Sequence, residues 1–567
     1  MTTEEKVTQW MSHPFDEYTQ KEVKKLKKDP KKLEDAFYTS LKFGTGGIRG
    51  IMGVGPNRIN KYTIGKSTQG LSQFLLKKYP NEQIKTVVAY DSRHNSKVFA
   101  KLVADIFTSN GISCYLFSEL RPTPELSFAV RYLKTHCGIV LTASHNPPNY
   151  NGYKVYGKDG GQLVSPDDKE IISEIDNTPF DCIKFDGNIN LLKYINKKVD
   201  FAYYNTILSE ALMHNFDKTQ LKIVFTSLHG TSITAIPQIL DMAGYKKIYI
   251  VKEQEKPDGN FSTVKSPNPE DKMALDIAVS LAGNKNADLV IGTDPDADRL
   301  GIVIRNLENN WYYLNGNQIM VILTEYLLNK LENNNKLGPN NFIASTIVST
   351  PMILDLANAY GVEYKNCLTG FKWIAKLIED SPKLKFIGGG EESFGYLVGD
   401  KIRDKDAISA SLLACELASE LQSNGKSVFE FLIECYKKYG LYVERLISIT
   451  KEGKDGAHQI ISIMKKFREN PPKEIGGVPI LKVDDYLLSE TKYFKNNQKK
   501  KISLPKENVL IFTLEGNSRV SLRPSGTEPK IKFYFSVTSK YKKDLSFEMQ
   551  QKQLNEKIDL FVNDLLS

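Results

Sequence analysis

Short apolar runs that end in small or polar residues recur along this chain of 567 residues. The runs span residues 138–146, 222–230, 289–298, 342–350 and 386–395. Consecutive apolar positions are typical of a strand that is buried on both faces. Helical stretches lie between the runs, for example 315–332 and 406–422. This alternation predicts parallel α/β sheets, and in such sheets ligands bind beyond the carboxyl ends of the strands.

Changes in this pattern divide the chain into four predicted domains. A chain of this length also suggests about four domains, at roughly 150 residues each. The first 40 residues are charged and helical and form a leading extension, and the last part is richer in lysine and contains a strand pair near 508–536. The predicted domains span residues 1–205, 206–314, 315–445 and 446–567.

The net charge of +9 is compatible with nucleic acid, a membrane surface or small anionic substrates as partners. The clearest basic run, residues 21–32, has its lysines at helical spacing, which predicts a solvated helix face. The sequence has no nucleic-acid-binding signature, no apolar stretch long enough to span a bilayer and no apolar segment of a signal peptide. We therefore expect a cytoplasmic protein without a nucleic-acid or membrane partner.

The six cysteines do not form a recognisable framework. No two of them are spaced as CxxC, the spacing that zinc sites and redox motifs use. In an intracellular chain of this length we expect reduced, mostly buried thiols.

The first chemical motif is TASHNPP at residues 142–148, followed by NGYK at 151–154. A serine at a strand tip, Ser144, beside His145 and near Lys154, is a candidate nucleophile or phosphoryl carrier. The motif differs from the GxSxG elbow of hydrolases. Because Ser, Asn and Pro also form ordinary turns, the motif alone leaves both interpretations open.

The second motif places Asp294, Asp296 and Asp298 directly after an apolar strand. Alternate side chains of an extended segment point the same way, and three carboxylates on one side repel one another unless a cation lies among them. Hard oxygen ligands suit Mg²⁺. An EF-hand is excluded, because the sixth loop position is Arg299 instead of glycine and the twelfth is Arg305 instead of glutamate. The motif therefore predicts a magnesium site.

Three glycine-containing loops complete the set: FGTGGIRG at 43–50, GGGEESFGY at 388–396 and RPSGTEPK at 523–530. Glycines let a backbone approach a ligand closely, and Glu and Ser side chains can bond sugar hydroxyls. Arginine, hydroxyls and backbone amides form a phosphate cradle, while no Walker loop or GxGxxG fingerprint is present. Each loop alone is also explained as a turn.

Together these groups are typical of a mutase, an enzyme that moves a phosphoryl group between two hydroxyls of its substrate. Phosphoryl transfer depends on positioning, a cation and charge-neutralising groups. A donor serine combined with a separate phosphate cradle implies a substrate that has a phosphate at one end and a reacting hydroxyl at the other.

The segments TASHNPPNYNGYKVYG, GTDPDADRLG, GGGEESFGY and RPSGTEPKIKFY, in this order, resemble the α-D-phosphohexomutase superfamily. The leading FGTGGIRGIMG and the length resemble its phosphoglucomutase branch, which has phosphopentomutase-like members. The resemblance covers most of residues 40–535 and is thinnest in the first 40 residues and in 445–505. It implies four domains around a central cleft: three related α/β domains with mixed sheets and a C-terminal α+β domain of the TBP-like type.

The resemblance also implies a role for each catalytic group. Ser144 would be phosphorylated, and Mg²⁺ would be held by Asp294, Asp296, Asp298 and a phosphoserine oxygen. Arg49 and Arg299 would flank the phosphoserine. Lys154 would be the acid/base, which requires a lowered pKa, and His145 is the alternative or the residue that orients the phosphate.

The substrate-binding residues that the resemblance implies come from three loops. Discrimination between sugars would depend on Gly370, Phe371 and Lys372. Hydrogen bonds to the sugar hydroxyls would come from Glu391 and Ser393. The phosphate that does not react would be held by Arg523, Ser525, Gly526, Thr527 and Lys530.

The implied reaction is the interconversion of glucose 1-phosphate and glucose 6-phosphate through glucose 1,6-bisphosphate, which is both intermediate and activator. Mannose and pentose phosphates are alternative substrates. Three rival functions are a dehalogenase-type phosphatase that uses Asp294 as nucleophile, a bisphosphate synthase and an inactive sugar-phosphate-binding protein. We expect a monomer, with a dimer as the alternative.

Overall fold

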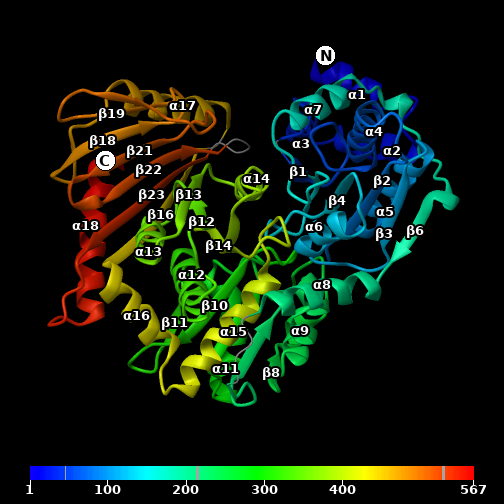
Figure 1. The fold of residues 1–567 in the computed structure, drawn as a ribbon. Helices are drawn as coiled ribbons and strands as arrows, with labels where there is room; N and C mark the ends of the chain where they lie inside the picture. The colour runs from blue at the N-terminus through cyan, green and yellow to red at the C-terminus, as the bar shows by residue number, and fades with distance from the viewer. Residues whose placement is uncertain (45, 212–215, 452, 526–529, 567) are drawn as a thin grey trace. The chain divides into compact units, whose positions relative to one another are not determined.

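The computed structural model describes all residues except 45, 212–215, 452, 526–529 and 567. The chain divides into two compact units (Figure 1). The first unit contains Met1–Gly316 and Phe371–Ser427, and the second contains Asn317–Gly370 and Val428–Ser567. Among the described residues, no helix combines the length and the apolar character that crossing a membrane requires. All six cysteines are free thiols and only Cys182 is exposed, as predicted.

The leading extension of the first unit is helical, as the sequence predicts. It forms α1 (Thr3–Gln9), α2 (Glu17–Leu26) and α3 (Pro30–Phe37). Each helix begins after a capping side chain that accepts a backbone N–H bond, from Thr2, Asp16 and Asp29 respectively. The extension packs through an aromatic cluster that consists of Trp10, Phe15, Phe37 and Tyr62.

A six-stranded mixed sheet in the order β1-β5-β4-β2-β3-β6 follows in the first unit. Its strands are β1 (Gly47–Ile51), β2 (Lys85–Tyr90), β3 (Ser113–Phe117), β4 (Cys137–Leu141), β5 (Tyr150–Tyr156) and β6 (Leu192–Ile195). Its helices are α4 (Lys61–Lys78), α5 (Ser96–Ser109), α6 (Thr123–Tyr132) and α7 (Asp167–Asn177), with the short η1 (Phe180–Cys182) and η2 (Ile189–Leu191). Every residue of β4 is buried, as its apolar run predicts. The antiparallel β5 returns directly from the tip of β4.

A five-stranded sheet in the order β11-β10-β9-β7-β8 comes next. Its strands are β7 (Lys222–Thr226), β8 (Lys247–Ile250), β9 (Leu289–Thr293), β10 (Leu300–Arg305) and β11 (Trp311–Tyr313). The helices are α8 (Lys197–Glu210), η3 (Thr231–Thr234), α9 (Ile236–Met242), α10 (Lys252–Glu255), η4 (Lys272–Leu275) and α11 (Asp276–Lys285). Strands β7, β8 and β9 are parallel, and β10 returns antiparallel to β9. The aspartate motif lies in the turn between β9 and β10.

The first unit is completed by a later segment of the chain. This segment contains α14 (Lys372–Glu379), the antiparallel pair β14 (Lys385–Glu391) and β15 (Gly395–Val398), and α15 (Ala407–Ser423). Helix α15 is buried along nearly its whole length and contacts α9, β9 and β10. The backbone N–H of Ala407 donates to the carbonyl of Ala297 at 3.2 Å, so this helix begins against the aspartate turn.

The second unit combines a small parallel pair of strands with a larger antiparallel sheet. The pair is β12 (Asn341–Thr346) and β13 (Glu363–Cys367), with α12 (Gly316–Asn333), α13 (Met352–Tyr360) and α16 (Val428–Tyr439). The sheet contains β16 (Leu441–Thr450), β18 (Val478–Asp485), β19 (Glu490–Tyr493), β20 (Lys499–Lys501), β21 (Leu510–Leu514), β22 (Arg519–Pro524) and β23 (Lys530–Ser539), and β17 (Glu474–Ile475) pairs with β18. With α17 (Gly453–Glu469) and α18 (Phe547–Leu566), this part has the predicted α+β character.

Candidate active site

Ser144 lies at the tip of β4 and is 1 % exposed. Its φ of +51° is in the left-handed region, which a residue other than glycine seldom adopts, and such backbone outliers cluster at functional sites. Its Oγ donates to Oδ2 of Asp294 at 2.5 Å and lies 3.2 Å from Nδ1 of His145. The fold thus brings together the serine and the first aspartate, two residues that lie far apart in the sequence.

The backbone of the serine loop is held by a buried arginine that the sequence patterns did not reveal. Arg93 donates to the carbonyl oxygens of Ser144 at 2.6 Å and Pro147 at 2.8 Å. Its own position is fixed by Asp91, whose Oδ2 lies 3.3 Å from Nε. Both residues follow the apolar strand β2, so the pattern of polar residues at strand tips would have found them.

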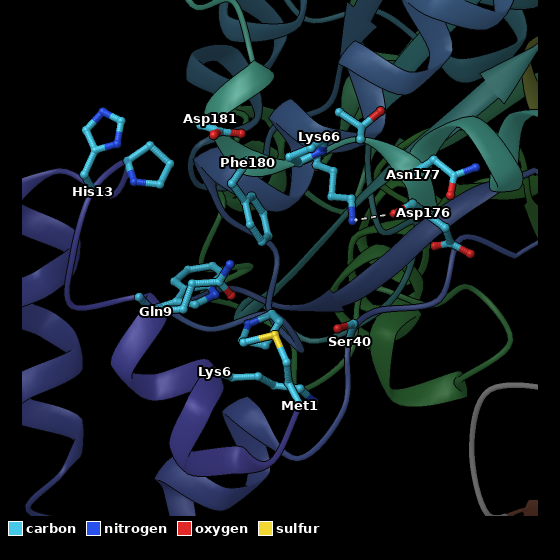
Figure 2. A pocket seen from close by; sticks show the side chains of 15 residues that line it. Met1, Lys6, Gln9, His13, Ser40, Lys66, Asp176, Asn177, Phe180 and Asp181 are labelled. Carbon is cyan, nitrogen blue, oxygen red and sulfur yellow. Dashed lines mark hydrogen bonds between the residues drawn. The ribbon is translucent and has the colours of Figure 1, made fainter.

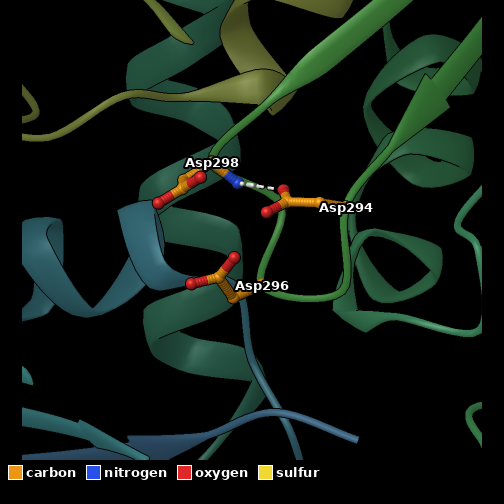
Figure 3. A group of neighbouring side chains, drawn as sticks. All are labelled: Asp294, Asp296 and Asp298. Carbon is orange, nitrogen blue, oxygen red and sulfur yellow. Dashed lines mark hydrogen bonds between the residues drawn. The ribbon is translucent and has the colours of Figure 1, made fainter. Parts of the chain in front are cut away.

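The three aspartates of the β9–β10 turn are all buried and converge (Figure 3). Their candidate ligand oxygens lie within 4.8 Å of one another. Oδ1 of Asp294 accepts the backbone N–H groups of Asp298 at 3.1 Å and Arg299 at 3.0 Å. In the described part of the chain, Oδ1 of Asp296 and Oδ1 of Asp298 have no hydrogen-bond partner. Buried carboxylate oxygens without partners are what a hard divalent cation requires, so the residues fit Mg²⁺.

Two lysines lie against this carboxylate cluster. Nζ of Lys154, on β5, is 2.7 Å from Asp296 and 3.2 Å from Asp298. Nζ of Lys405, which the sequence did not single out, is 3.1 Å from Asp298. Gly395 leaves room for this lysine, because a Cβ there would lie 2.1 Å from the Lys405 Cδ. The two cations offset part of the negative charge that the aspartates bring together.

The charges in the cluster shift one another's pKa values. Burial and the neighbouring carboxylates raise the pKa of Asp294 well above its usual value. For Asp296, burial acts to raise the pKa, but Lys154, a hydrogen bond with Asp294 and the charge of Lys405 together outweigh it and the pKa falls. For Lys154, burial acts to lower the pKa, but Asp296 and Asp298 outweigh it and the pKa is raised. This differs from the lowered pKa expected of Lys154, because the sequence did not show that two carboxylates would contact its Nζ.

The predicted flanking groups reach the serine loop from two elements. Arg49, on β1, donates from Nη1 to Oδ1 of Asn146 at 2.8 Å. Arg299 follows the aspartate turn and pairs with Glu270. Burial lowers the pKa of His145 well below its usual value, and the charges of Arg299 and Arg49 lower it further. His145 is therefore neutral at physiological pH.

The predicted sugar-binding residues Phe371, Lys372, Glu391 and Ser393 also lie in the first unit, and Gly370 is the residue just before its second segment. Glu391 ends β14 and is buried, and Ser393 is in the turn that leads to β15. Phe371 and Lys372 begin α14, and the Phe371 ring centroid lies 5.6 Å from Nζ of Lys405. Lys405 thus contacts both the carboxylate cluster and the start of this helix. Gly370, which precedes them, has a φ of +114°, a conformation that favours glycine.

The predicted phosphate cradle belongs to the second unit, where β22 leads into β23. Nε of Arg523 donates to Oε1 of Glu507 at 3.0 Å. The backbone N–H of Ser525 donates to the carbonyl of Lys530 at 2.7 Å, which closes the base of the loop. Gly526 and Thr527 lie outside the described residues.

Comparison with known proteins gives concordant matches along the chain. Models described as phosphoglucomutase/phosphomannomutase alpha/beta/alpha domains I, II and III match residues 40–181, 202–308 and 315–439. The phosphoglucomutase of Staphylococcus epidermidis (strain ATCC 12228 / FDA PCI 1200) is 39% identical over 535 residues, which cover 93% of this chain and 95% of that protein. The phosphoglucomutase of Staphylococcus aureus (strain USA300) is 42% identical over 509 residues, covering 89% and 90%.

Solved structures share the fold at lower sequence identity. The open form of pp63/parafusin, a phosphoglucomutase from Paramecium, superposes with a TM-score of 0.68 at 18% identity and covers 93% of this chain and 95% of its own. A putative phosphomannomutase from Thermus thermophilus gives a TM-score of 0.66 at 21% identity, covering 93% and 98%. These likenesses extend over nearly the whole chain.

Proposed function

This chain belongs to the phosphoglucomutase/phosphomannomutase family, and we propose that it is a phosphoglucomutase, an isomerase that interconverts glucose 1-phosphate and glucose 6-phosphate. Relatives of that name match about nine tenths of the chain at 39% and 42% identity. The observation that carries the proposal is the buried contact between Ser144 and Asp294 within a cluster of three carboxylates. That contact supports the proposal of a phosphoryl carrier next to a cation site.

Ser144 is the proposed phosphoryl carrier. In the forward step, a sugar hydroxyl oxygen forms a bond to the phosphorus of phosphoserine while the bond from phosphorus to the serine Oγ breaks. The product of this step is glucose 1,6-bisphosphate, which then returns its other phosphoryl group to Ser144. Arg93 holds the loop that presents the serine oxygen, so that this oxygen stays fixed during both transfers.

The proposed Mg²⁺ site is formed by Asp294, Asp296, Asp298 and an oxygen of phosphoserine. When bound, the ion neutralises charge on the transferred phosphoryl group. The two buried Oδ1 atoms without hydrogen-bond partners in the described part of the chain support this assignment. Arg49 and Arg299 are proposed to stabilise the remaining phosphate charge from either side.

Lys154 is the proposed acid/base. Its protonated form donates a proton to a departing hydroxyl oxygen, and its neutral form accepts the proton of an attacking hydroxyl. A divalent cation bound to Asp296 and Asp298 would offset their negative charge, so these carboxylates would raise the pKa of Lys154 less than they do without the ion. A pKa closer to neutrality favours both roles of the lysine. Neutral His145, with Nδ1 3.2 Å from the serine Oγ, is proposed to orient the phosphoserine.

The remaining predicted residues are proposed to bind the sugar and its second phosphate. Glu391 and Ser393 would bond hydroxyls, and Gly370, Phe371 and Lys372 would discriminate between sugars. Arg523, Ser525, Gly526, Thr527 and Lys530 would grip the phosphate that does not react. We further propose that the protein acts as a cytoplasmic monomer and that added glucose 1,6-bisphosphate activates it by phosphorylating Ser144.

The direct test compares glucose, mannose and ribose 1-phosphates as substrates, with Mg²⁺ and a trace of glucose 1,6-bisphosphate. We expect the glucose ester to be converted fastest. Faster conversion of the mannose or ribose ester would keep the mechanism and change the substrate. Release of inorganic phosphate without isomer formation would refute the mutase proposal and favour a phosphatase.

A further inference from the structure

A polar cavity of about 460 Å³ lies in the first unit, and none of the candidate active-site residues lines it. We call it the N-terminal cavity. Its walls come from α1 and the chain after it, from α4, and from residues 176–181, which end α7 and follow it (Figure 2). The match to the family's first domain begins at residue 40, so one wall belongs to the leading extension and the opposite wall to the matched domain. A cavity of this volume accommodates a small metabolite.

Lys66, on α4, is the lysine in the wall that belongs to the matched domain, and Lys6 lines the cavity from α1. Its Nζ donates to the backbone carbonyl of Asp176 at 3.3 Å and lies 5.5 Å from the ring centroid of Phe180. In the described part of the chain, no carboxylate oxygen pairs with it. Burial lowers the pKa of Lys66, because its charge is only partly solvated. The charge of Asp176 opposes this effect only in part, and a bound anion would add further counter-charge beside the lysine.

An aromatic face lies beside this lysine. The Phe180 ring packs edge-on against Trp10, with ring centroids 5.6 Å apart, so its orientation is fixed. Figure 2 shows Phe180 projecting into the opening between the two walls. Aromatic faces of this kind pack against the C–H face of a sugar ring, because both surfaces are apolar.

Hydrogen-bonding groups complete the lining. Asp176 and Asp181 offer carboxylates, Asn177 and Gln9 offer amides, and His13 lies at the rim. Carboxylates and amides accept hydrogen bonds from sugar hydroxyls. The same two carboxylates would repel a ligand with several consecutive phosphates, such as a nucleoside triphosphate, more strongly than a ligand with one phosphate. The lining is therefore suited to one phosphate on a polyhydroxylated ring.

We propose that the N-terminal cavity is a second binding site, for a small phosphorylated sugar, with the phosphate at Lys66 and the sugar ring on Phe180. The site is separate from the catalytic reaction and does not require it. Inorganic phosphate would contact only Lys66. A sugar without phosphate would contact only the Phe180 ring and the two carboxylates. Both should bind more weakly than the complete ligand.

Hydrogen–deuterium exchange on the full-length protein tests this site. The probes are glucose 6-phosphate, ribose 5-phosphate and inorganic phosphate. We expect one of the sugar phosphates to slow exchange in residues 10–14 and 176–182, at lower concentration than inorganic phosphate does. The variant Lys66→Met should weaken this protection by about tenfold or more, since a charge-assisted bond is lost.

Matched variants show whether a loss of protection comes from the N-terminal cavity itself. Lys77→Met is on the same helix but outside the cavity and should leave the protection unchanged. Phe180→Ala should weaken binding of the sugar phosphates more than binding of inorganic phosphate. Protection around residues 142–154 reports the catalytic site independently and should persist in every variant. The proposal is overturned if neither sugar phosphate protects the two segments, if Lys66→Met binds as well as the unaltered protein, or if inorganic phosphate binds equally tightly.

Discussion

At the scale of single residues, Ser144 illustrates both the reach and the limit of sequence reasoning. The strand-tip position, the neighbouring histidine and the later lysine were visible in the sequence. Its 2.5 Å contact with Asp294 was not, because contacts between distant segments arise only in the folded chain. Lys405 was missed for the same reason, because its importance depends on what it touches. Arg93 was also missed, although its position after the apolar strand β2 could have revealed it.

Replacement of Ser144 by alanine tests its proposed role directly. Without the oxygen that accepts the phosphoryl group, we expect mutase kcat to fall by at least about a thousandfold. A coupled assay for glucose 6-phosphate gives the rate, and mass spectrometry after incubation with glucose 1,6-bisphosphate should show no phosphorylated protein. The control Thr142→Ser keeps the hydroxyl that accepts the Ser144 backbone N–H and should stay active. Substantial turnover by Ser144→Ala would disprove the phosphoserine mechanism.

A second prediction concerns pH and the buried Asp406, which caps α15 and accepts a bond from the Tyr203 hydroxyl at 2.8 Å. Burial raises the pKa of Asp406 to about 6. Because the folded pKa exceeds that of the unfolded chain, the folded state binds the proton more tightly. The resulting stabilisation is present below about pH 4 and is lost as the pH rises to about 6, a change of about 3 kcal/mol.

Thermal unfolding of the variant Asp406→Asn measures this effect, since asparagine can still accept the capping bonds. Relative to the variant, the unaltered protein should lose stability between about pH 4 and pH 6 and then change no further. The variant Asp400→Asn, at a partly exposed position nearby, should show no such difference. Parallel pH profiles for Asp406→Asn and the unaltered protein would contradict the prediction.

At the scale of elements, the apolar runs were reliable. The runs at 138–146 and 289–298 begin with β4 and β9, and the predicted helices at 315–332 and 406–422 correspond to α12 and α15. The returning strand β5 was harder to predict. Strand β5 is rich in Asn, Gly and Tyr and lacks an apolar run, yet its backbone pairs with β4 and positions Lys154.

The first turn of α6 leads to a third prediction. Thr123 donates its backbone N–H to the Asp296 carbonyl at 2.9 Å and its hydroxyl to Oδ2 at 3.1 Å. These bonds leave Oδ1 of Asp296 for the proposed ion. Replacement by valine should weaken Mn²⁺ binding, measured by electron paramagnetic resonance, by about tenfold, whereas Thr123→Ser should bind normally. Equal affinity in Thr123→Val and the unaltered protein would mean that Thr123 does not orient Asp296.

At the scale of the whole molecule, the order of the α/β domains and the α+β character of the C-terminal part followed from the sequence. The division into two compact units did not, because it depends on where residues 371–427 pack. Helix α15 contacts α9, β9 and β10, so a segment distant in sequence completes the first unit. Local patterns of apolar residues do not reveal such a return of the chain. The positions of the three boundaries between the four predicted domains stay predictions.

Metal binding should therefore stabilise the two units unequally. Every proposed protein ligand of Mg²⁺ lies in the first unit. At a hundredfold excess over Kd, the ion should stabilise that unit by about 2.7 kcal/mol. Calorimetry with and without EDTA should shift the unfolding transition that is assigned to the first unit, by exchange or proteolysis, and Asp298→Asn should abolish the shift. A shift confined to the second unit would contradict the proposed site.

The path of the chain between the units has a consequence for biosynthesis. Residues 317–370 interrupt the first unit, so a ribosome makes Ser144 and the three aspartates long before it makes α15 and Lys405. Until residue 423 has emerged from the exit tunnel, β9, β10 and α9 lack the buried helix that covers them, and apolar surface of this kind attracts other chains. The nascent protein therefore passes through a stage in which its catalytic residues already exist but the helix that covers their sheet does not, and apolar surface stays exposed during this stage.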